Sequence, residues 1–183
     1  MSRLRVVAVI VAVQAVLIGV YWLVERERSA GDDAGRASGV LGTAPPQEVS
    51  GVAPSLWLTR ADGSRFEMSP RERPLLVHFW ATWCPPCRDE LPGLLAVPNA
   101  HPVDILAVAL DAEWADVETF LDGEDDSNVV LGDARRAETA FGVHTLPVTF
   151  LVEPGAHLRF RFQGARDWTD PDFVRRWLLA KSP

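Results

Sequence analysis

The chain has 183 residues, of which 48% are hydrophobic and 23% are charged, which is enough for one domain of roughly 130 residues with a hydrophobic core. The apolar fraction and the seven Trp exclude a largely disordered protein, and the net charge of −7 disfavours nucleic acid as a partner, because an acidic chain repels a phosphate backbone. The two cysteines exclude a disulfide-stapled scaffold and an iron–sulfur cluster held by four thiolates of this chain.

The first segment, Val6–Val24, is a run of 19 residues without a charged side chain. As a helix it would span roughly 28 Å, close to the hydrocarbon thickness of a bilayer. A cleaved signal peptide is the alternative, but cleavage after Ala30 would put Arg28 at the unfavourable −3 position. We therefore expect an uncleaved transmembrane signal anchor over residues 1–24, with the N-terminus in the cytoplasm and the rest of the chain outside it.

Residues 25–54 are rich in Gly, Ala, Ser and Pro and show no apolar periodicity. This composition predicts a flexible linker. The folded domain is then expected over residues 55–183.

The domain begins with a predicted β-hairpin, in which Leu56–Leu58 and Arg65–Glu67 flank an Asp-Gly turn. The short apolar run Leu75–Trp80 predicts a strand buried on both faces. The later expected elements are a helix over Arg88–Ala96, a strand over Asp104–Leu110, a helix carrying Trp114 to Leu121, a strand over Val129–Leu131, a helix over Ala134–Phe141 capped by Asp133, strands over Val148–Val152 and Leu158–Phe162, and a helix begun by Asp170 and Pro171. Alternating strands and helices predict an α/β sheet covered on both faces.

The two cysteines, Cys84 and Cys87, come directly after a predicted strand and open a predicted helix. A helix N-terminus presents unpaired N–H groups and a positive dipole end, which stabilise a thiolate at Cys84. Two intervening residues bring Cys87 within disulfide distance, so that Cys84 can attack a disulfide of another protein and Cys87 can resolve the mixed disulfide. An inert pair or a metal clip is the alternative, which the flanking Trp83 and the two intervening prolines disfavour.

Residues 79–92, FWATWCPPCRDELP, resemble the active-site segment of the TlpA/ResA group of thioredoxin-like proteins, which are membrane-anchored thiol–disulfide oxidoreductases of the periplasm or outer cell face. Residues 141–152 resemble the cis-proline loop of that group, and residues 164–168 resemble its C-terminal motif. The resemblance implies a thioredoxin-like α/β fold, with a central mixed β-sheet, helices on both faces, an N-terminal β-hairpin and a central βα insertion.

The resemblance also assigns roles to single residues. Cys84 corresponds to the exposed nucleophile, Cys87 to the resolving thiol, Pro147 to the cis-proline that faces the disulfide, and Glu90 to the acid just after the cysteine pair. His78 occupies the position six residues before Cys84, where thioredoxin has a buried Asp, and is a candidate proton relay. Substrate contacts are expected at Trp83, Pro85, Pro86, Leu146 and Pro147.

Two further features concern the surroundings of this site. Because Pro98 and Pro102 interrupt the region that follows Pro92, we expect the active-site helix to be truncated. His144 stands beside the expected cis-proline loop, where it either contacts substrate or is an ordinary loop residue.

The leading functional hypothesis is a reductase of protein disulfides outside the cytoplasm. By resemblance, a transmembrane thiol donor would supply its electrons, and apocytochrome c is one client among several disulfide-containing proteins. A disulfide-forming oxidase and a non-enzymatic Cu(I)-binding module built on the cysteine pair remain as alternatives. Neither a cofactor nor a catalytic metal is expected.

Overall fold

The computed structural model describes Gln14, Gly42 and residues 44–69, 71–124 and 127–179. The chain divides into two units, Met1–Val40 and Leu41–Pro183. Apart from Gln14, the anchor expected over Val6–Val24 lies outside the described residues. Within the described ranges, no helix combines the length and the apolar character that crossing a bilayer requires.

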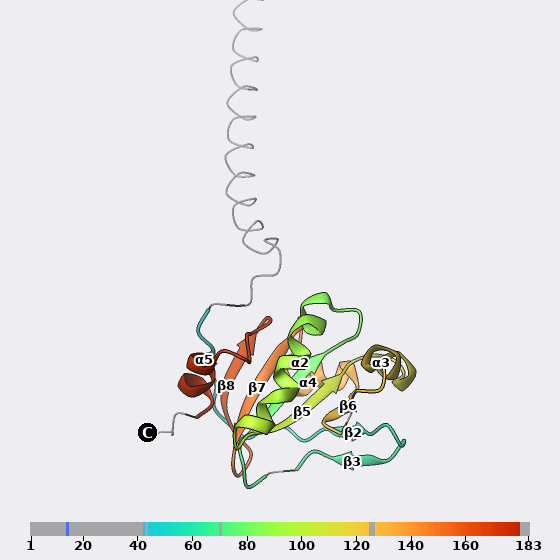
Figure 1. Ribbon diagram of the computed structural model, residues 1–183, viewed down its shortest axis with the longest axis horizontal. Coiled ribbons are helices and arrows are strands. Elements are labelled where there is room, and N and C mark those ends of the chain that lie inside the picture. The colour runs from blue at the N-terminus through green and yellow to red at the C-terminus, as the bar shows by residue number, and fades with distance from the viewer. Residues whose placement is uncertain (1–13, 15–41, 43, 70, 125–126, 180–183) are drawn as a thin grey trace, which may run out of the picture. The chain divides into compact units, whose positions relative to one another are not determined.

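A single mixed sheet forms the centre of the unit Leu41–Pro183 and, over the described residues, has eight strands (Figure 1). Their order across the sheet is β1-β8-β7-β4-β5-β6-β2-β3. Strands β4, β5 and β6 are parallel to one another, and β7 runs antiparallel to β4. The bounds are β1 (Gln47–Glu48), β2 (Trp57–Thr59), β3 (Arg65–Glu67), β4 (Leu75–Trp80), β5 (Asp104–Ala109), β6 (Val129–Leu131), β7 (Val148–Glu153) and β8 (His157–Gln163).

Helices cover both faces of this sheet, as the alternation of elements predicts. On one face, α2 (Pro85–Ala100), α3 (Trp114–Leu121) and α5 (Pro171–Trp177) contribute side chains to one hydrophobic cluster. On the other face, α4 (Ala134–Phe141) contributes to a second cluster. The hairpin of β2 and β3 lies at one edge of the sheet, and β7 and β8 form the closing antiparallel pair.

Strand β4 separates the two hydrophobic clusters, because successive side chains of a strand point to opposite faces. Leu76 and Trp80 belong to the cluster under α2, whereas Val77 and Phe79 belong to the cluster under α4. All six residues of β4 are buried, which confirms the expectation from its apolar sequence. His78 shares the parity of Leu76 and Trp80, so its side chain is directed toward α2.

The expectation of a truncated active-site helix is wrong. Helix α2 continues for 16 residues and contains both Pro92 and Pro98 within its span. Each proline removes one backbone hydrogen bond, but Leu91, Leu94 and Val97 are buried on this helix, and packing of an apolar face stabilises a helix more than local propensity does.

The helix ends just before Pro102. His101, its C-cap, has an extended backbone, which is the conformation that a following proline favours.

The expected flexible linker is also wrong over residues 44–54. Strand β1 pairs with β8, with Gln47 opposite Arg161, and the Ala53 N–H donates to the Ala156 carbonyl over 2.7 Å. The segment is held mainly through its backbone, and this is why it lacks the apolar periodicity from which a strand can be predicted. We refer to Gly42 and residues 44–54 as the leading segment; residues 25–41 lie outside the described residues.

Candidate active site

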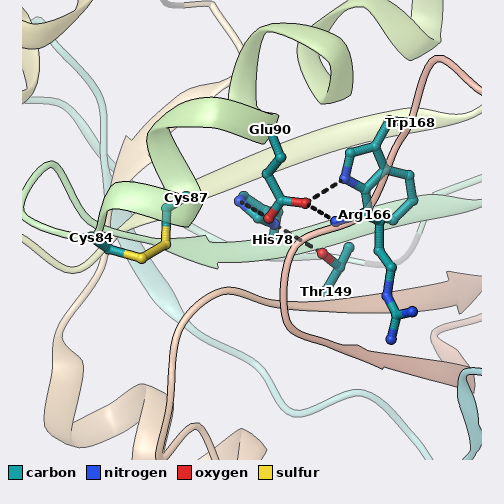
Figure 2. Close-up of polar contacts among 7 residues, drawn as sticks. All are labelled: His78, Cys84, Cys87, Glu90, Thr149, Arg166 and Trp168. Atoms are coloured by element: carbon teal, nitrogen blue, oxygen red, sulfur yellow. Dashed lines mark hydrogen bonds and ion pairs between the residues drawn. A yellow bond between two sulfur atoms is a disulfide. The ribbon is translucent and has the colours of Figure 1, made fainter. Parts of the chain in front are cut away.

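The two cysteines form a disulfide at the start of α2 (Figure 2), with their Cα atoms 5.3 Å apart. Cys84 is the N-cap of the helix, and Pro85 and Pro86 fill the first helical positions, where the missing N–H groups of proline leave no bond unmade. Cys84 keeps 5% of its surface exposed, whereas Cys87 has none. Of the two sulfurs, that of Cys84 is therefore the better placed to meet another protein.

The loop that precedes the disulfide is held by a carboxylate that the sequence did not single out. Asp111, just beyond β5, accepts hydrogen bonds from the Thr82 N–H and from the Thr82 hydroxyl, the latter over 2.6 Å. Asp111 is itself buried. This contact joins the end of β5 to the loop between β4 and α2. It therefore holds in place the backbone that leads into Cys84.

A groove of about 290 Å³ brings two of the predicted substrate-contact residues together, Trp83 and Leu146. Trp83 is 67% exposed, and His144 lies on the same groove. The Leu146–Pro147 peptide bond is cis, as the resemblance implies. Pro85 and Pro86 are exposed and Pro147 is buried, and none of the three lines this groove.

Glu90 lies one turn after Cys87 on α2, and its carboxyl is enclosed by other elements (Figure 2). Its Oε2 atom accepts hydrogen bonds from the Arg166 backbone N–H over 2.7 Å and from the Trp168 indole N–H over 2.9 Å. Its Oε1 atom lies 3.7 Å from His78 Nε2. Both side chains are fully buried, so the structure brings together the two residues that were predicted separately.

Burial shifts the protonation of this pair in opposite directions. Burial raises the pKa of Glu90 from 4.5 to about 7, against the opposing effect of the hydrogen bonds from Arg166 and Trp168. Burial also lowers the pKa of His78 from 6.5 to about 3. At neutral pH the imidazole is therefore uncharged, and Glu90 is poised to gain or lose a proton.

The imidazole of His78 can accommodate either protonation state of Glu90. Its Nδ1 atom lies 2.9 Å from the hydroxyl of Thr149, the residue opposite His78 in the β4–β7 register, and a hydroxyl can donate or accept. With Nδ1 protonated, Nε2 can accept a hydrogen bond from a protonated Glu90. With Nε2 protonated, it can donate to the carboxylate.

The residues that sequence reasoning missed are Asp111, Thr149, Arg166 and Trp168. Arg166 and Trp168 lie inside residues 164–168, which resemble the C-terminal motif of the TlpA/ResA group. The motif identifies this segment in the sequence, but it does not reveal that both residues contact Glu90. Thr149 faces His78 only because of the strand register, which the sequence does not state. Asp111 had no distinguishing signal.

Comparison with known proteins agrees with this geometry. The chain is 30% identical over 126 residues to the thiol-disulfide oxidoreductase ResA of Oceanobacillus iheyensis, covering 64% of this chain and 66% of the relative. It is 33% identical over 108 residues to the ResA protein of Bacillus subtilis, covering 56% of this chain and 60% of the relative. The chain thus spans slightly less than two thirds of either relative.

The fold is that of thioredoxin. The thioredoxin domain of a thiol-disulfide oxidoreductase from Bacteroides vulgatus superposes with a TM-score of 0.59 at 22% identity, covering 70% of this chain and 96% of that domain. The thioredoxin-like fold and the resemblance to ResA-type proteins expected from the sequence are both confirmed. The sequence model of the AhpC/TSA family matches residues 49–161, more than half of the chain, and the chain therefore belongs to the AhpC/TSA family.

Proposed function

We propose that this protein is a thiol–disulfide oxidoreductase that reduces disulfides of other proteins outside the cytoplasm. The observation that carries the proposal is the Cys84–Cys87 disulfide at the N-terminus of α2, with the buried Glu90 one turn further along the same helix. A helix N-terminus stabilises the thiolate of its N-cap cysteine, and a nearby buried carboxyl supplies a site for the second proton.

The reaction starts from the reduced protein. The Cys84 thiolate attacks one sulfur of the client disulfide, which forms a mixed disulfide and releases a client thiolate. Cys87 then loses its proton and attacks the Cys84 sulfur, which releases the second client thiolate and forms the Cys84–Cys87 disulfide. Two electrons pass to the client, whose two thiolates take up protons.

Glu90 is the proposed acceptor of the Cys87 proton. Its side chain and that of Cys87 both leave α2 on the side that faces the sheet (Figure 2), and its raised pKa of about 7 suits exchange of a proton near neutral pH. His78 supports the exchange by pairing with either form of Glu90, as the contact with Thr149 allows. The cis-proline loop and Trp83 would hold the client next to the disulfide, with His144 at the rim of the groove.

We further propose that residues 6–24 anchor the chain in a membrane as a helix, with the N-terminus in the cytoplasm. An oxidising compartment does not sustain a reduced dithiol, so a transmembrane thiol donor would have to regenerate the protein after each turnover. Disulfide-containing proteins, apocytochrome c among them, are the proposed clients. The uncharged length of residues 6–24 supports this location.

The reduction potential of the Cys84–Cys87 couple tests the direction of the reaction. A value near −270 mV, about that of thioredoxin, agrees with a reductant, and a value near −120 mV would indicate an oxidase instead. Equilibration of the purified protein with glutathione or dithiothreitol buffers, followed by mass spectrometry of the alkylated thiols, measures it. Cys84→Ser is the matched control, because it abolishes the couple.

A further inference from the structure

Arg166 is a buried arginine whose two terminal guanidinium nitrogens donate to backbone carbonyls. It has only 3% of its surface exposed. Nη1 donates to the carbonyls of Gly42 and, over 2.7 Å, of Ala44, and Nη2 donates to the Gln163 carbonyl over 2.9 Å. Arg166 thus ties the leading segment to the loop that follows β8.

The backbone of the same residue contacts the active-site acid. The Arg166 N–H donates to Glu90 Oε2, and Trp168, two residues further on, donates its indole N–H to the same oxygen. Both hydrogen bonds that Glu90 receives therefore come from one short loop (Figure 2). The position of this loop sets the position of both donors.

A third observation concerns how tightly the leading segment fits against this arginine. A Cβ atom added to Gly42 would stand 3.0 Å from the guanidinium carbon and from one guanidinium nitrogen of Arg166. Such a contact is closer than side chains tolerate without movement. Gly42 therefore lets the backbone of the leading segment approach the guanidinium.

We propose that Arg166 is a positioning residue for Glu90, and that through Arg166 the seating of the leading segment controls the hydrogen bonds of the active-site acid. The proposal rests on the function proposed above, in which Glu90 exchanges the proton of Cys87. It connects the leading segment to Glu90 through one residue, because the Arg166 guanidinium contacts the segment and the Arg166 N–H contacts the acid.

The direction of the effect follows from the groups that face Glu90. The titratable or charged groups that act on it are the neutral His78 from β4 and Arg166 from the loop after β8. Arg166 contacts Glu90 through its backbone N–H, and its guanidinium, which points away from Glu90 in Figure 2, acts through its charge alone. Hydrogen bonds to a carboxylate and a nearby positive charge both favour the ionised form. Loosening the loop or removing the charge therefore raises the pKa of Glu90 above about 7.

The test follows the Glu90 carboxyl directly in the full chain, by ¹³C NMR titration of selectively labelled glutamate with Glu90→Gln to identify the signal. We expect Arg166→Gln to shift the Glu90 midpoint upward by about one pH unit. Arg175→Gln is the matched control, because Arg175 is exposed on α5 and pairs with Asp172, and it should leave the midpoint in place. An unchanged midpoint in Arg166→Gln would overturn the positioning role.

A second variant keeps both the charge and the loop sequence. Gly42→Val should displace the leading segment from Arg166 and shift the Glu90 midpoint in the same direction as Arg166→Gln, whereas Ser50→Val, at an exposed position of the same segment, should not shift it. A wild-type midpoint in Gly42→Val would refute the link to the leading segment, even if Arg166→Gln failed to fold. The titration requires no turnover, so its result does not depend on the proposed function. The proposed function would fail separately, if the wild-type chain did not reduce insulin disulfides.

Discussion

His78 Nε2 lies 3.7 Å from Glu90 Oε1, and both atoms are buried without a hydrogen-bond partner among the residues that the structure describes. The contact arises because His78 is directed from β4 toward the face that α2 covers. Shortening the separation by less than 1 Å would bring the two atoms into hydrogen-bond range. The hydrogen bond between His78 and Glu90 is therefore available to form when Glu90 takes up the proton of Cys87.

Glu90→Gln tests this pair through stability as well as activity. A carboxyl whose pKa is raised from 4.5 to about 7 stabilises the fold fully below pH 4.5, and this contribution is lost as the pH rises through 7. The wild type should therefore lose about 3 kcal/mol of unfolding free energy relative to Glu90→Gln across this window. Urea denaturation at pH 4.5 and pH 8 measures the difference, and parallel pH dependences would contradict the raised pKa.

The same variant should slow turnover above pH 7. An amide can still accept the hydrogen bonds from Arg166 and Trp168 but cannot take up a proton from Cys87, so we expect a loss of about tenfold in the rate of disulfide reduction at pH 8. The rate of insulin reduction measures this loss. If the rate at pH 8 stayed at the wild-type value, water would be the better candidate for the proton acceptor.

His78 should remain uncharged over the whole range in which the protein works. Its pKa is lowered to about 3 by burial, so the stability that its neutral form provides is present above pH 6.5 and is lost as the pH falls through 6.5 toward 3. ¹⁵N NMR of labelled histidine, with His78→Asn to identify the signals, should show no protonation of His78 at pH 5. A His78 signal that titrates near pH 6.5 would contradict its burial as a neutral residue.

Much of the fold could be predicted from local patterns. The turn between β2 and β3, the buried run of β4, the Asp133 cap of α4 and the Asp170–Pro171 start of α5 are all signals within a few residues of each other, and each is borne out. What failed depended on contacts between distant segments. Packing under α2 overrides its internal prolines, and backbone pairing with β8 orders a segment without an apolar pattern.

The candidate site divides in the same way. Cys84, Cys87 and Glu90 lie within seven residues, so one motif identifies them. The partners of Glu90 come from β4 and from the loop after β8, and their meeting depends on strand order and register. The motif is therefore enough to identify the cysteines and the acid in the sequence. The hydrogen bonds that set the pKa of Glu90 become visible only in the tertiary structure.

The difference in exposure between the two cysteines predicts which one holds the client. Cys87→Ser should accumulate mixed disulfides through Cys84, because Cys84 stands at the helix N-terminus and keeps some exposure whereas Cys87 keeps none. Non-reducing electrophoresis and mass spectrometry detect these adducts. Cys84→Ser is the matched variant, and more adduct in it than in Cys87→Ser would reverse the assignment.

The leading segment should contribute to stability, and a soluble form of the domain should therefore begin before β1. Removing residues 1–54 deletes the hydrogen bonds that join Val49, Gly51 and Ala53 to the β7–β8 hairpin, and it also removes the buried side chain of Ala53. These three backbone bonds at about 1 kcal/mol each already suggest a loss of about 3 kcal/mol in the free energy of unfolding. The deletion also removes the pairing of β1 with β8 and the carbonyls of Gly42 and Ala44 that Arg166 contacts, so we expect a loss of at least that size.

The comparison is between a chain that starts at residue 42 and one that starts at residue 55, both unfolded in urea. The shorter chain also exposes the edge of β8, which β1 covers, and an unpaired edge strand invites association between molecules. Size-exclusion chromatography should therefore show the shorter chain, and not the longer one, shifting toward larger species as concentration rises. Equal unfolding free energies and equal elution would mean that residues 42–54 act only as a linker, as their composition alone predicts.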